Sequence, residues 1–277
     1  MISRIVIALI WIPILLIVLL FLPPYIFVGV VVLICTISAY ELLSSIGQKG
    51  NERIKIYAVF SAALIPVGVY FNLVELVFLG VLLLLMFFVF FEAIAAYGRT
   101  KQITLVNILI TLFGGAILPL MISTLVAMRN MPDGHLIVLL PVISAFVTDG
   151  GAYFAGVFFG KHRAFPYVSP KKTIEGCIGG LLAGMIAMLI YGVVLVYATP
   201  HYIHFWALIL YGFIGSLVTQ FGDLAFSLIK REYNIKDYGR FLGEHGGVLD
   251  RFDSMVFTAP AMYLLVTAIP AIIVRGS

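Results

Sequence analysis

Apolar segments of about 20 residues recur along the whole chain, and they restrict its fold more than any other feature. A helix needs about 20 mainly apolar residues to cross the roughly 30 Å hydrocarbon core of a bilayer. Hydrophobic residues make up 62% of the 277 residues and charged residues only 11%, whereas soluble domains carry about 25% charged residues. The sequence therefore predicts an all-α, polytopic integral membrane protein.

Nine segments have the length and composition of a transmembrane helix. They are residues 4–21, 24–44, 55–71, 74–97, 103–128, 136–160, 174–198, 204–228 and 253–274. The apolar part of the first segment is too long for a signal peptide, and no small-residue cleavage site follows it. We therefore expect about nine transmembrane helices, the first of them retained.

The basic residues predict the orientation, because loops rich in Lys and Arg stay on the cytoplasmic side. With nine spans, one side of the membrane receives all 17 basic residues except Arg129 and Arg275. We expect a cytoplasmic N-terminus and cytoplasmic loops at 161–173 and 229–252, in a multi-pass protein of the cell inner (plasma) membrane. The net charge of +4 then reflects topology, and no basic groove with interleaved aromatic residues predicts nucleic-acid binding.

The two parts of the chain differ in polarity. Residues 1–100 are mostly Leu, Ile, Val and Phe, and we interpret them as an N-terminal transmembrane scaffold. Glu41, Glu75 and Glu92 lie near span ends there, where anchoring at the membrane interface is favoured over catalysis. The spans after about residue 136 are rich in Gly and contain acidic residues, so we interpret 101–277 as the catalytic region.

Glycines recur at four-residue spacing in the seventh segment, at Gly176, Gly180 and Gly184. Small residues at this spacing allow helix backbones to approach closely in membranes. Packing within the bundle is favoured over a dimer interface.

Acidic residues gather near the cytoplasmic ends of the later segments. Asp223 shares a helix face with Gln220 and Ser227, so a polar stripe leads into the bundle from the cytoplasmic end; burial against Arg or Lys for packing alone is the alternative. Asp250 and Asp253 share a face at the start of the last segment, and Asp149 lies within the sixth. These four aspartates are the candidate metal ligands.

A cation is expected among these carboxylates, because they would otherwise repel one another. Hard oxygen donors without a His or Cys pair predict Mg²⁺ and not zinc. Mg²⁺ usually takes one or two carboxylates and completes its shell with water and substrate phosphate. The chemistry therefore predicts a substrate that contains phosphate.

The segment Ser169-Pro170-Lys171-Lys172-Thr173 also favours phosphate binding. Ser followed by Pro is a typical helix start, and the N-terminus of a helix attracts anions. We therefore expect the seventh helix to begin here, with Lys171 and Lys172 beside its N-terminus. Ordinary positive-inside flanking explains the two lysines equally well.

A charged, Gly-rich run from Ser227 to Asp253 separates the last two segments. Within it, His245-Gly246-Gly247 could form a turn whose backbone N–H groups approach a phosphate. His245 is a candidate general base, although a structural role in the turn explains it equally well. Basic residues of the same run can neutralise a polyanion, namely Lys230, Arg231, Lys236 and Arg240.

The same run resembles the signature of phosphatidate cytidylyltransferases, the CDP-diacylglycerol synthases. The matching positions are Ser227, Ile229-Lys230-Arg231, Lys236-Asp237, Gly239, Leu242-Gly243, His245-Gly246-Gly247 and Asp250-Arg251-Phe252-Asp253. The segment from Ser169 to Glu175, and Asp149 before it, also resemble that family. The likeness is strong from about 140 to 254, whereas residues 1–100 match only in being helical and apolar.

The resemblance implies an enzyme, a nucleotidyltransferase of phospholipid biosynthesis that transfers the cytidylyl group of CTP to phosphatidic acid. The products would be CDP-diacylglycerol and pyrophosphate. It also implies Mg²⁺ dependence, with K⁺ as a candidate second cation, and a homodimer in the lipid bilayer.

Together, the residues and the resemblance give a set of candidate site residues. The catalytic candidates are Asp223, Asp250, Lys171, Lys172 and His245, and the candidate Mg²⁺ ligands are Asp223, Asp250, Asp253 and Asp149. The candidate substrate-binding residues are Ser169, Ser227, Lys230, Arg231, Lys236, Asp237, Gly246, Gly247 and Arg251.

Two other functions fit parts of the pattern. A CTP-dependent lipid kinase of the polyprenol or phytol type would transfer the γ-phosphate, but it is not expected to carry the complete HGG-x-x-DR-x-D pattern. An ion-coupled transporter would place acidic groups near mid-bilayer in two related halves. Here the acidic groups gather at one face and no repeated half is visible, so the cytidylyltransferase is favoured.

Overall fold

The computed structural model describes residues 19–20, 22–46, 51–98, 102–241, 243 and 246–274, and it is mainly helical. The helices are α2 (Pro24–Ser45), α3 (Glu52–Tyr70), α4 (Val74–Ala96), α5 (Leu105–Leu112), the π-helical turn η1 (Phe113–Ile117), α6 (Leu118–Arg129), α7 (Gly134–Ile137), α8 (Leu139–Phe159), α9 (Ile174–Ala198), α10 (Phe205–Glu232) and α11 (Leu249–Ala268). The strands are β1 (Arg163–Phe165), β2 (Ser169–Thr173), β3 (His201–Ile203) and β4 (Ile272–Val274).

Seven stretches of the described chain are long and apolar enough to cross a membrane. They are α2, α3, α4, the continuous segment from α5 to α6, the segment from α7 to α8, α9 and α10. These match the second to the eighth of the nine expected segments. Most of the first expected segment, 4–21, lies outside the described residues, so the count of nine is not confirmed.

The ninth segment differs from the expectation of a span over 253–274. Helix α11 begins earlier, at Leu249, and ends at Ala268, and it is not among the seven apolar spans. Asp250, Arg251 and Asp253 lie within its first two turns and lower its hydropathy. The chain after α11 forms β4, which pairs antiparallel with β3 from Ile203↔Ile272 to His201↔Val274.

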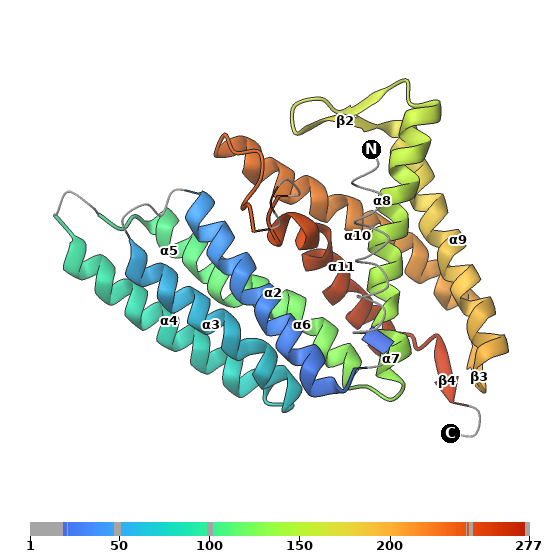
Figure 1. The fold of residues 1–277 in the computed structure, drawn as a ribbon, viewed down its shortest axis with the longest axis horizontal. Coiled ribbons are helices and arrows are strands. Elements are labelled where there is room, and N and C mark those ends of the chain that lie inside the picture. The colour runs from blue at the N-terminus through green and yellow to red at the C-terminus, as the bar shows by residue number, and fades with distance from the viewer. Residues whose placement is uncertain are drawn as a thin grey trace.

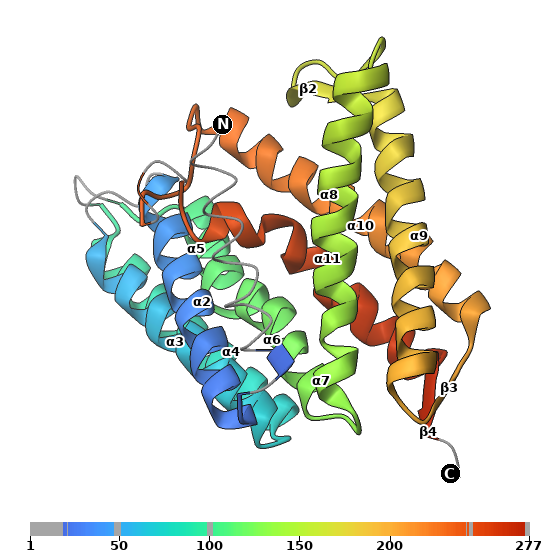
Figure 2. The same cartoon turned by 45° about the vertical axis from the view of Figure 1, so that its right-hand side comes forward.

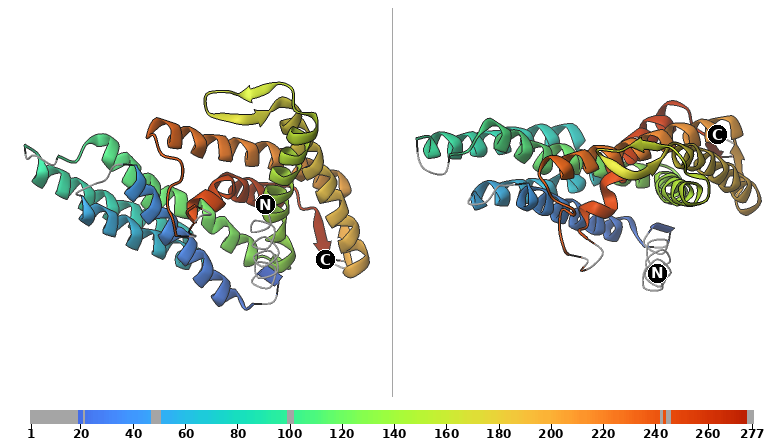
Figure 3. Two further views of the ribbon diagram at one scale, coloured as in Figure 1. Left: turned by 45° about the horizontal axis from the view of Figure 1, so that its top comes forward. Right: turned by 90° about the horizontal axis from the view of Figure 1, so that it is seen from above.

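The helices form two groups with α11 between them (Figure 1). Helices α2, α3 and α4 pack with the segment from α5 to α6 in the first group, and α8, α9 and α10 pack together in the second. Helix α11, red in Figure 3, contacts α2 and α6 of the first group and α8 and α10 of the second. Both groups can therefore hold residues at the start of α11. The proposed functional division at residue 100 stays a prediction.

The turn η1 interrupts the span between α5 and α6. Helix α5 begins at a capping box in which Thr104 accepts a hydrogen bond from the backbone N–H of Asn107. Pro119 has no N–H to complete the normal i→i−4 pattern, and the wider turn at Phe113–Ile117 ends two residues before it. Wide turns of this kind keep a helix continuous across such an interruption.

Helices α8 and α9 lie side by side along most of their length (Figure 2), and glycines form their interface. A Cβ at Gly176 would lie 2.8 Å from the Ala152 carbonyl oxygen, and one at Gly180 would lie 2.8 Å from that of Thr148. The close approach needs these glycines, so the prediction that they serve packing within the bundle is confirmed.

The fold is mainly helical, as predicted, and its loops add two short pairs of strands that were not predicted. β1 and β2 form an antiparallel hairpin at one end of α8 and α9, and β3 and β4 form a second pair at the other end (Figure 1). One expectation about the loops was wrong, because Ser169 does not cap a helix that starts at Pro170. The segment Ser169–Thr173 is strand β2, held by pairing with β1, and α9 begins at Ile174 with the Thr173 hydroxyl as its N-terminal cap.

The charged loop between the last two helices is also shorter than the expected 229–252. Helix α10 continues to Glu232 and α11 begins at Leu249. Lys230 and Arg231 are therefore helical residues, and Asp250 lies in the first turn of a helix.

Candidate active site

Carboxylates from three helices meet where α8, α10 and α11 approach one another. Asp149 comes from α8, Asp223 from α10, and Asp250 and Asp253 from the start of α11. Asp253 is buried and interacts electrostatically with Asp223 and Asp149. The structure thus brings together acidic residues that are up to 104 positions apart in the sequence, as their numbers 149 and 253 show.

Lys172 of β2 forms an ion pair with Asp223, and both side chains are partly exposed. Asp149 lies close enough to interact electrostatically with both residues. The hairpin β1–β2 therefore places the positively charged Lys172 side chain beside the carboxylates of α8 and α10. Asp223 thus has a lysine partner, as in the alternative that the sequence left open, and that lysine comes from the Lys-Lys segment, which is a strand. The role of Asp223 as a metal ligand stays a prediction.

Contacts with Glu175 hold the hairpin against the start of α9. One Glu175 carboxylate oxygen accepts hydrogen bonds from the backbone N–H groups of Lys161 (3.1 Å) and His162 (3.2 Å). The other lies 2.6 Å from His162 Nδ1. Arg231 of α10 adds a second attachment, because its Nε donates to the carbonyl oxygen of Val168 over 3.2 Å. The position of Lys172 is thus fixed from both α9 and α10.

Lys230 connects α10 to both aspartates of α11. Its Nζ lies 3.0 Å from Asp250 Oδ1 and 3.5 Å from Asp253 Oδ2, and 5.3 Å from the ring centroid of Tyr238. Burial and the charges of Asp253 and Asp250 raise the pKa of the Tyr238 phenol. The Tyr238 hydroxyl therefore stays protonated and donates to the Phe226 carbonyl oxygen over 2.9 Å.

Backbone groups of the loop between α10 and α11 complete the surroundings of Asp250. Its Oδ2 accepts hydrogen bonds from the N–H groups of Tyr238 (2.8 Å) and Gly247 (3.0 Å). Gly246 has φ +80°, a conformation that favours glycine. The predicted turn at Gly246-Gly247 thus lies beside a candidate metal ligand.

Glu41 of α2 is the residue that sequence reasoning misplaced. It was expected at the membrane interface, but it is buried, with 5% of its surface exposed. Its Oε2 accepts a hydrogen bond from the backbone N–H of Leu249 over 2.9 Å. An acidic residue among the apolar residues of 24–44 was the available signal. Of the other two glutamates, Glu92 pairs with Arg53 and Glu75 is exposed.

Other predicted site residues lie around this cluster. Gln220 of the expected polar stripe donates to the Cys177 carbonyl oxygen over 3.2 Å, and so packs α10 against α9. Ser169 and Ser227 are half-buried, and His245 lies outside the described residues. The remaining candidates are exposed near the same end of the bundle, namely Lys171, Lys236, Asp237 and Arg251.

The donor set fits Mg²⁺ only if substrate completes the coordination shell. No three acidic, His or Cys side chains of the described residues lie close enough together to hold a metal by themselves. Mg²⁺ normally needs only one or two carboxylates, with water and phosphate oxygens as its other ligands. Two of these aspartates together with a phosphate would satisfy that requirement.

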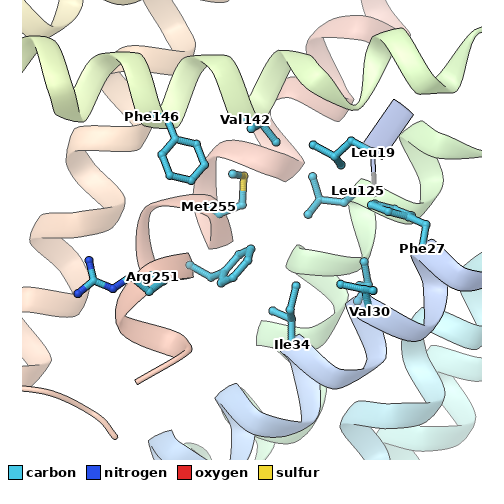
Figure 4. A pocket seen from close by; sticks show the side chains of 11 residues that line it. Leu19, Phe27, Val30, Ile34, Leu125, Val142, Phe146, Arg251 and Met255 are labelled. Carbon is cyan, nitrogen blue, oxygen red and sulfur yellow. The ribbon is translucent and has the colours of Figure 1, made fainter. Parts of the chain in front are cut away.

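A small apolar cavity lies beneath the first turns of α11 (Figure 4). Its volume is about 40 Å³, and residues of α2, α6, α8 and α11 line it, among them Val31, Leu125, Val142 and Met255. Arg251 also lines it, and its guanidinium group points away from the apolar side chains (Figure 4). A cavity of this size can hold a water or two but not a nucleotide, so it is not the binding site of the phosphate substrate.

Comparison with known proteins shows the family of this chain. The sequence pattern described as the "Cytidylyltransferase family" matches residues 2–269. The chain belongs to the cytidylyltransferase family. The match includes both groups of helices and every described aspartate and lysine of the cluster, so the resemblance expected from the sequence is confirmed.

Curated relatives of this cytidylyltransferase-family protein are named phosphatidate cytidylyltransferase. The protein of Staphylococcus haemolyticus (strain JCSC1435) is 41% identical over 133 residues, which are 48% of this chain and 50% of that protein. The protein of Staphylococcus saprophyticus is 39% identical over 137 residues, 50% of this chain and 51% of that protein. The protein of Staphylococcus aureus (strain COL) is 41% identical over 133 residues, which are 48% of this chain and 50% of that protein. The chain thus spans about half the length of the curated relatives it matches.

Proposed function

We propose that this chain transfers the cytidylyl group of CTP to phosphatidic acid, giving CDP-diacylglycerol and pyrophosphate for phospholipid biosynthesis. Family membership and the names of the curated relatives support this function. The single observation that carries it is the arrangement of Lys172 and Lys230 among the carboxylates of α8, α10 and α11. Such a site offers both cations for a triphosphate and ligands for a metal that binds it.

The candidate Mg²⁺ ligands are Asp223 and Asp250, with Asp253 and Asp149 as further ligands or as groups that orient them. When bound, Mg²⁺ would offset the negative charge of the phosphates. The residues fit this role because they come from three packed helices and carry hard oxygen donors. K⁺ as a second cation is proposed from the family resemblance alone.

The residues of the chain act mainly by positioning and charge neutralisation. A phosphate oxygen of phosphatidic acid attacks the α-phosphorus of CTP, and a new P–O bond forms as the bond to pyrophosphate breaks. Because the attacking phosphate is already an anion, little deprotonation is needed. Lys172 and Lys230, with Lys171 and Arg231 near them, neutralise the triphosphate and the leaving pyrophosphate.

The charged end of the bundle is proposed to face the cytoplasm, with the protein in the cell inner membrane. The hairpin β1–β2, the loop between α10 and α11 and the residues that flank them carry most of the described basic residues, namely Lys161, Arg163, Lys171, Lys172, Lys230, Arg231, Lys236, Arg240 and Arg251, which agrees with the positive-inside rule. Phosphatidic acid would then reach the site with its headgroup at the interface and its acyl chains in the bilayer. A homodimer is proposed from the resemblance, and chemical cross-linking in membranes tests it.

The position of the radioactive label in CTP tests the reaction class. Purified protein in micelles is given phosphatidic acid, Mg²⁺ and CTP labelled at either the α- or the γ-phosphorus. Cytidylyl transfer puts the α-label into chloroform-extractable lipid and leaves the γ-label in pyrophosphate. The γ-label in lipid would instead contradict this proposal and indicate a CTP-dependent lipid kinase.

A further inference from the structure

Glu41 is a buried acidic residue of the first helix group that reaches the candidate active site. It lies on α2, 208 residues before Leu249, whose backbone N–H donates to Glu41 Oε2 over 2.9 Å. That N–H belongs to the first turn of α11, and such groups have no partner within their own helix. A carboxylate is favourable there because the N-terminal end of a helix carries partial positive charge.

Two glycines of the charged loop pack directly against the Glu41 carboxyl group. A Cβ at Gly239 would lie 2.7 Å from Glu41 Cγ, and a Cβ at Gly247 would lie 2.6 Å from Glu41 Cδ. Real Cβ atoms do not approach other heavy atoms this closely. Two positions of the loop between α10 and α11, one near its middle and one near its end, therefore pack against the Glu41 side chain.

The segments that contact Glu41 also hold Asp250. Gly247 donates its N–H to Asp250 Oδ2, and so does Tyr238, the residue before Gly239. Leu249 is the neighbour of Asp250 in the chain. Three backbone positions next to Glu41 thus fix the place and direction of one candidate metal ligand, while Glu41 itself has no contact with the Asp250 carboxylate among the described interactions.

We propose that Glu41 is a positioning residue for the reaction, which orients Asp250 by holding the loop and the start of α11. This proposal rests on the proposed function for its catalytic consequence. It also makes the N-terminal helices more than a scaffold, since α2 contacts the loop and the start of α11 that hold Asp250.

The test compares Glu41→Ala and Glu41→Gln with the unchanged protein. Glutamine keeps an acceptor oxygen and the shape of the side chain, whereas alanine removes both. Misplacing a catalytic group by about 1 Å can cost roughly 100-fold in rate. We expect Glu41→Ala to raise KM for CTP about tenfold and to lower kcat, and Glu41→Gln to stay within about threefold of the unchanged protein.

Glu92→Ala is the matched control. Glu92 is also a glutamate of the N-terminal helices, but it contacts Arg53 and Tyr57, and its replacement should leave both constants unchanged. A loss of folded protein alone would lower the apparent kcat without changing KM for CTP. Unchanged KM in Glu41→Ala, or a Glu41→Gln variant as impaired as Glu41→Ala, would overturn the positioning role.

A second variant links the effect to the loop contact. On its own, Gly239→Ala should lower label transfer, because its new Cβ would clash with Glu41. In a protein that already carries Glu41→Ala, it should lower label transfer by less than a further factor of about three. Independent, additive losses would contradict the proposed contact.

Trypsin cleavage at the exposed Lys236 and Arg240 tests the conformation of the loop without measuring cytidylyl transfer. Glu41→Ala should be cut faster than the unchanged protein and Glu92→Ala at the same rate; equal rates for Glu41→Ala would overturn the role of Glu41 in holding the loop. If the unchanged protein transfers no label, the proposed function fails, and the trypsin comparison still decides whether Glu41 holds this loop.

Discussion

The Lys230 ammonium group donates a hydrogen bond to Asp250 Oδ1 over 3.0 Å and lies 3.5 Å from Asp253 Oδ2. One lysine of α10 thus binds two carboxylates from the first turns of α11. The three side chains are largely buried, with 13%, 6% and 10% of their side-chain surfaces exposed. The same lysine therefore stabilises the junction of two helices and places a positive charge at the candidate active site.

Replacing Lys230 by Met should impair both stability and activity. Removing one partner of a buried ion pair leaves an uncompensated charge and costs about 3–5 kcal/mol. We expect a lower midpoint of thermal unfolding in detergent, and label transfer reduced by about 100-fold or more. Lys161→Met removes an exposed lysine near the same end and should change neither quantity. A stable, active Lys230→Met protein would refute the role of this lysine.

Loosening the hairpin should weaken CTP binding more than it slows the chemical step. Glu175→Ala removes the acceptor that holds His162 and the N–H of Lys161. Without these hydrogen bonds the hairpin that carries Lys172 is held less firmly. KM for CTP, measured at saturating phosphatidic acid, should therefore rise by roughly threefold to tenfold. An unchanged KM would show that the hairpin position does not matter for CTP.

The close contact between α8 and α9 should not tolerate an added methyl group. In Gly180→Ala the new Cβ would lie 2.8 Å from the Thr148 carbonyl oxygen and 2.9 Å from Ala152 Cβ. Overpacking of this kind costs about 1–3 kcal/mol, so the midpoint of thermal unfolding should fall. Gly29→Ala is the control, because a Cβ there has no atom within 4 Å. Equal midpoints for the two variants would contradict this packing.

Removing divalent metal should stop the reaction without unfolding the protein. Lysines pair with Asp223, Asp250 and Asp253, so these carboxylates have partners of opposite charge in the fold without a metal. EDTA should abolish label transfer, excess Mg²⁺ should restore it, and the unfolding midpoint should stay the same. Activity that persists in EDTA would exclude the proposed metal role.

The membrane helices and the family could be predicted from the sequence because both depend on local patterns. A run of about 20 apolar residues specifies a span without reference to the rest of the chain. The four aspartates were recognisable for a similar reason, since each is a charged residue in or beside an apolar segment. Their partners, Lys172 and Lys230, also lie within segments that the charge pattern singled out.

The hairpin and Glu41 could not be predicted because tertiary contacts decide them. Ser169-Pro170 satisfies the local preferences of a helix start, but the pairing of Ser169 and Thr173 with β1 makes the segment a strand. Glu41 lies near the end of an apolar span, as an interfacial residue would. Its burial results from contacts with Gly239, Gly247 and Leu249, about 200 residues away in the sequence.

The most direct test of the central claim compares the unchanged protein with Asp223→Asn, which keeps the size of the side chain but removes its charge. Both proteins, shown to be folded in micelles, receive α-³²P-CTP, phosphatidic acid and Mg²⁺, and the chloroform-extractable label is counted. The account predicts lipid-borne label that requires phosphatidic acid and Mg²⁺ for the unchanged protein, and at least about a 100-fold loss for Asp223→Asn. Equal labelling by the two proteins, or no labelled lipid from either, would contradict it.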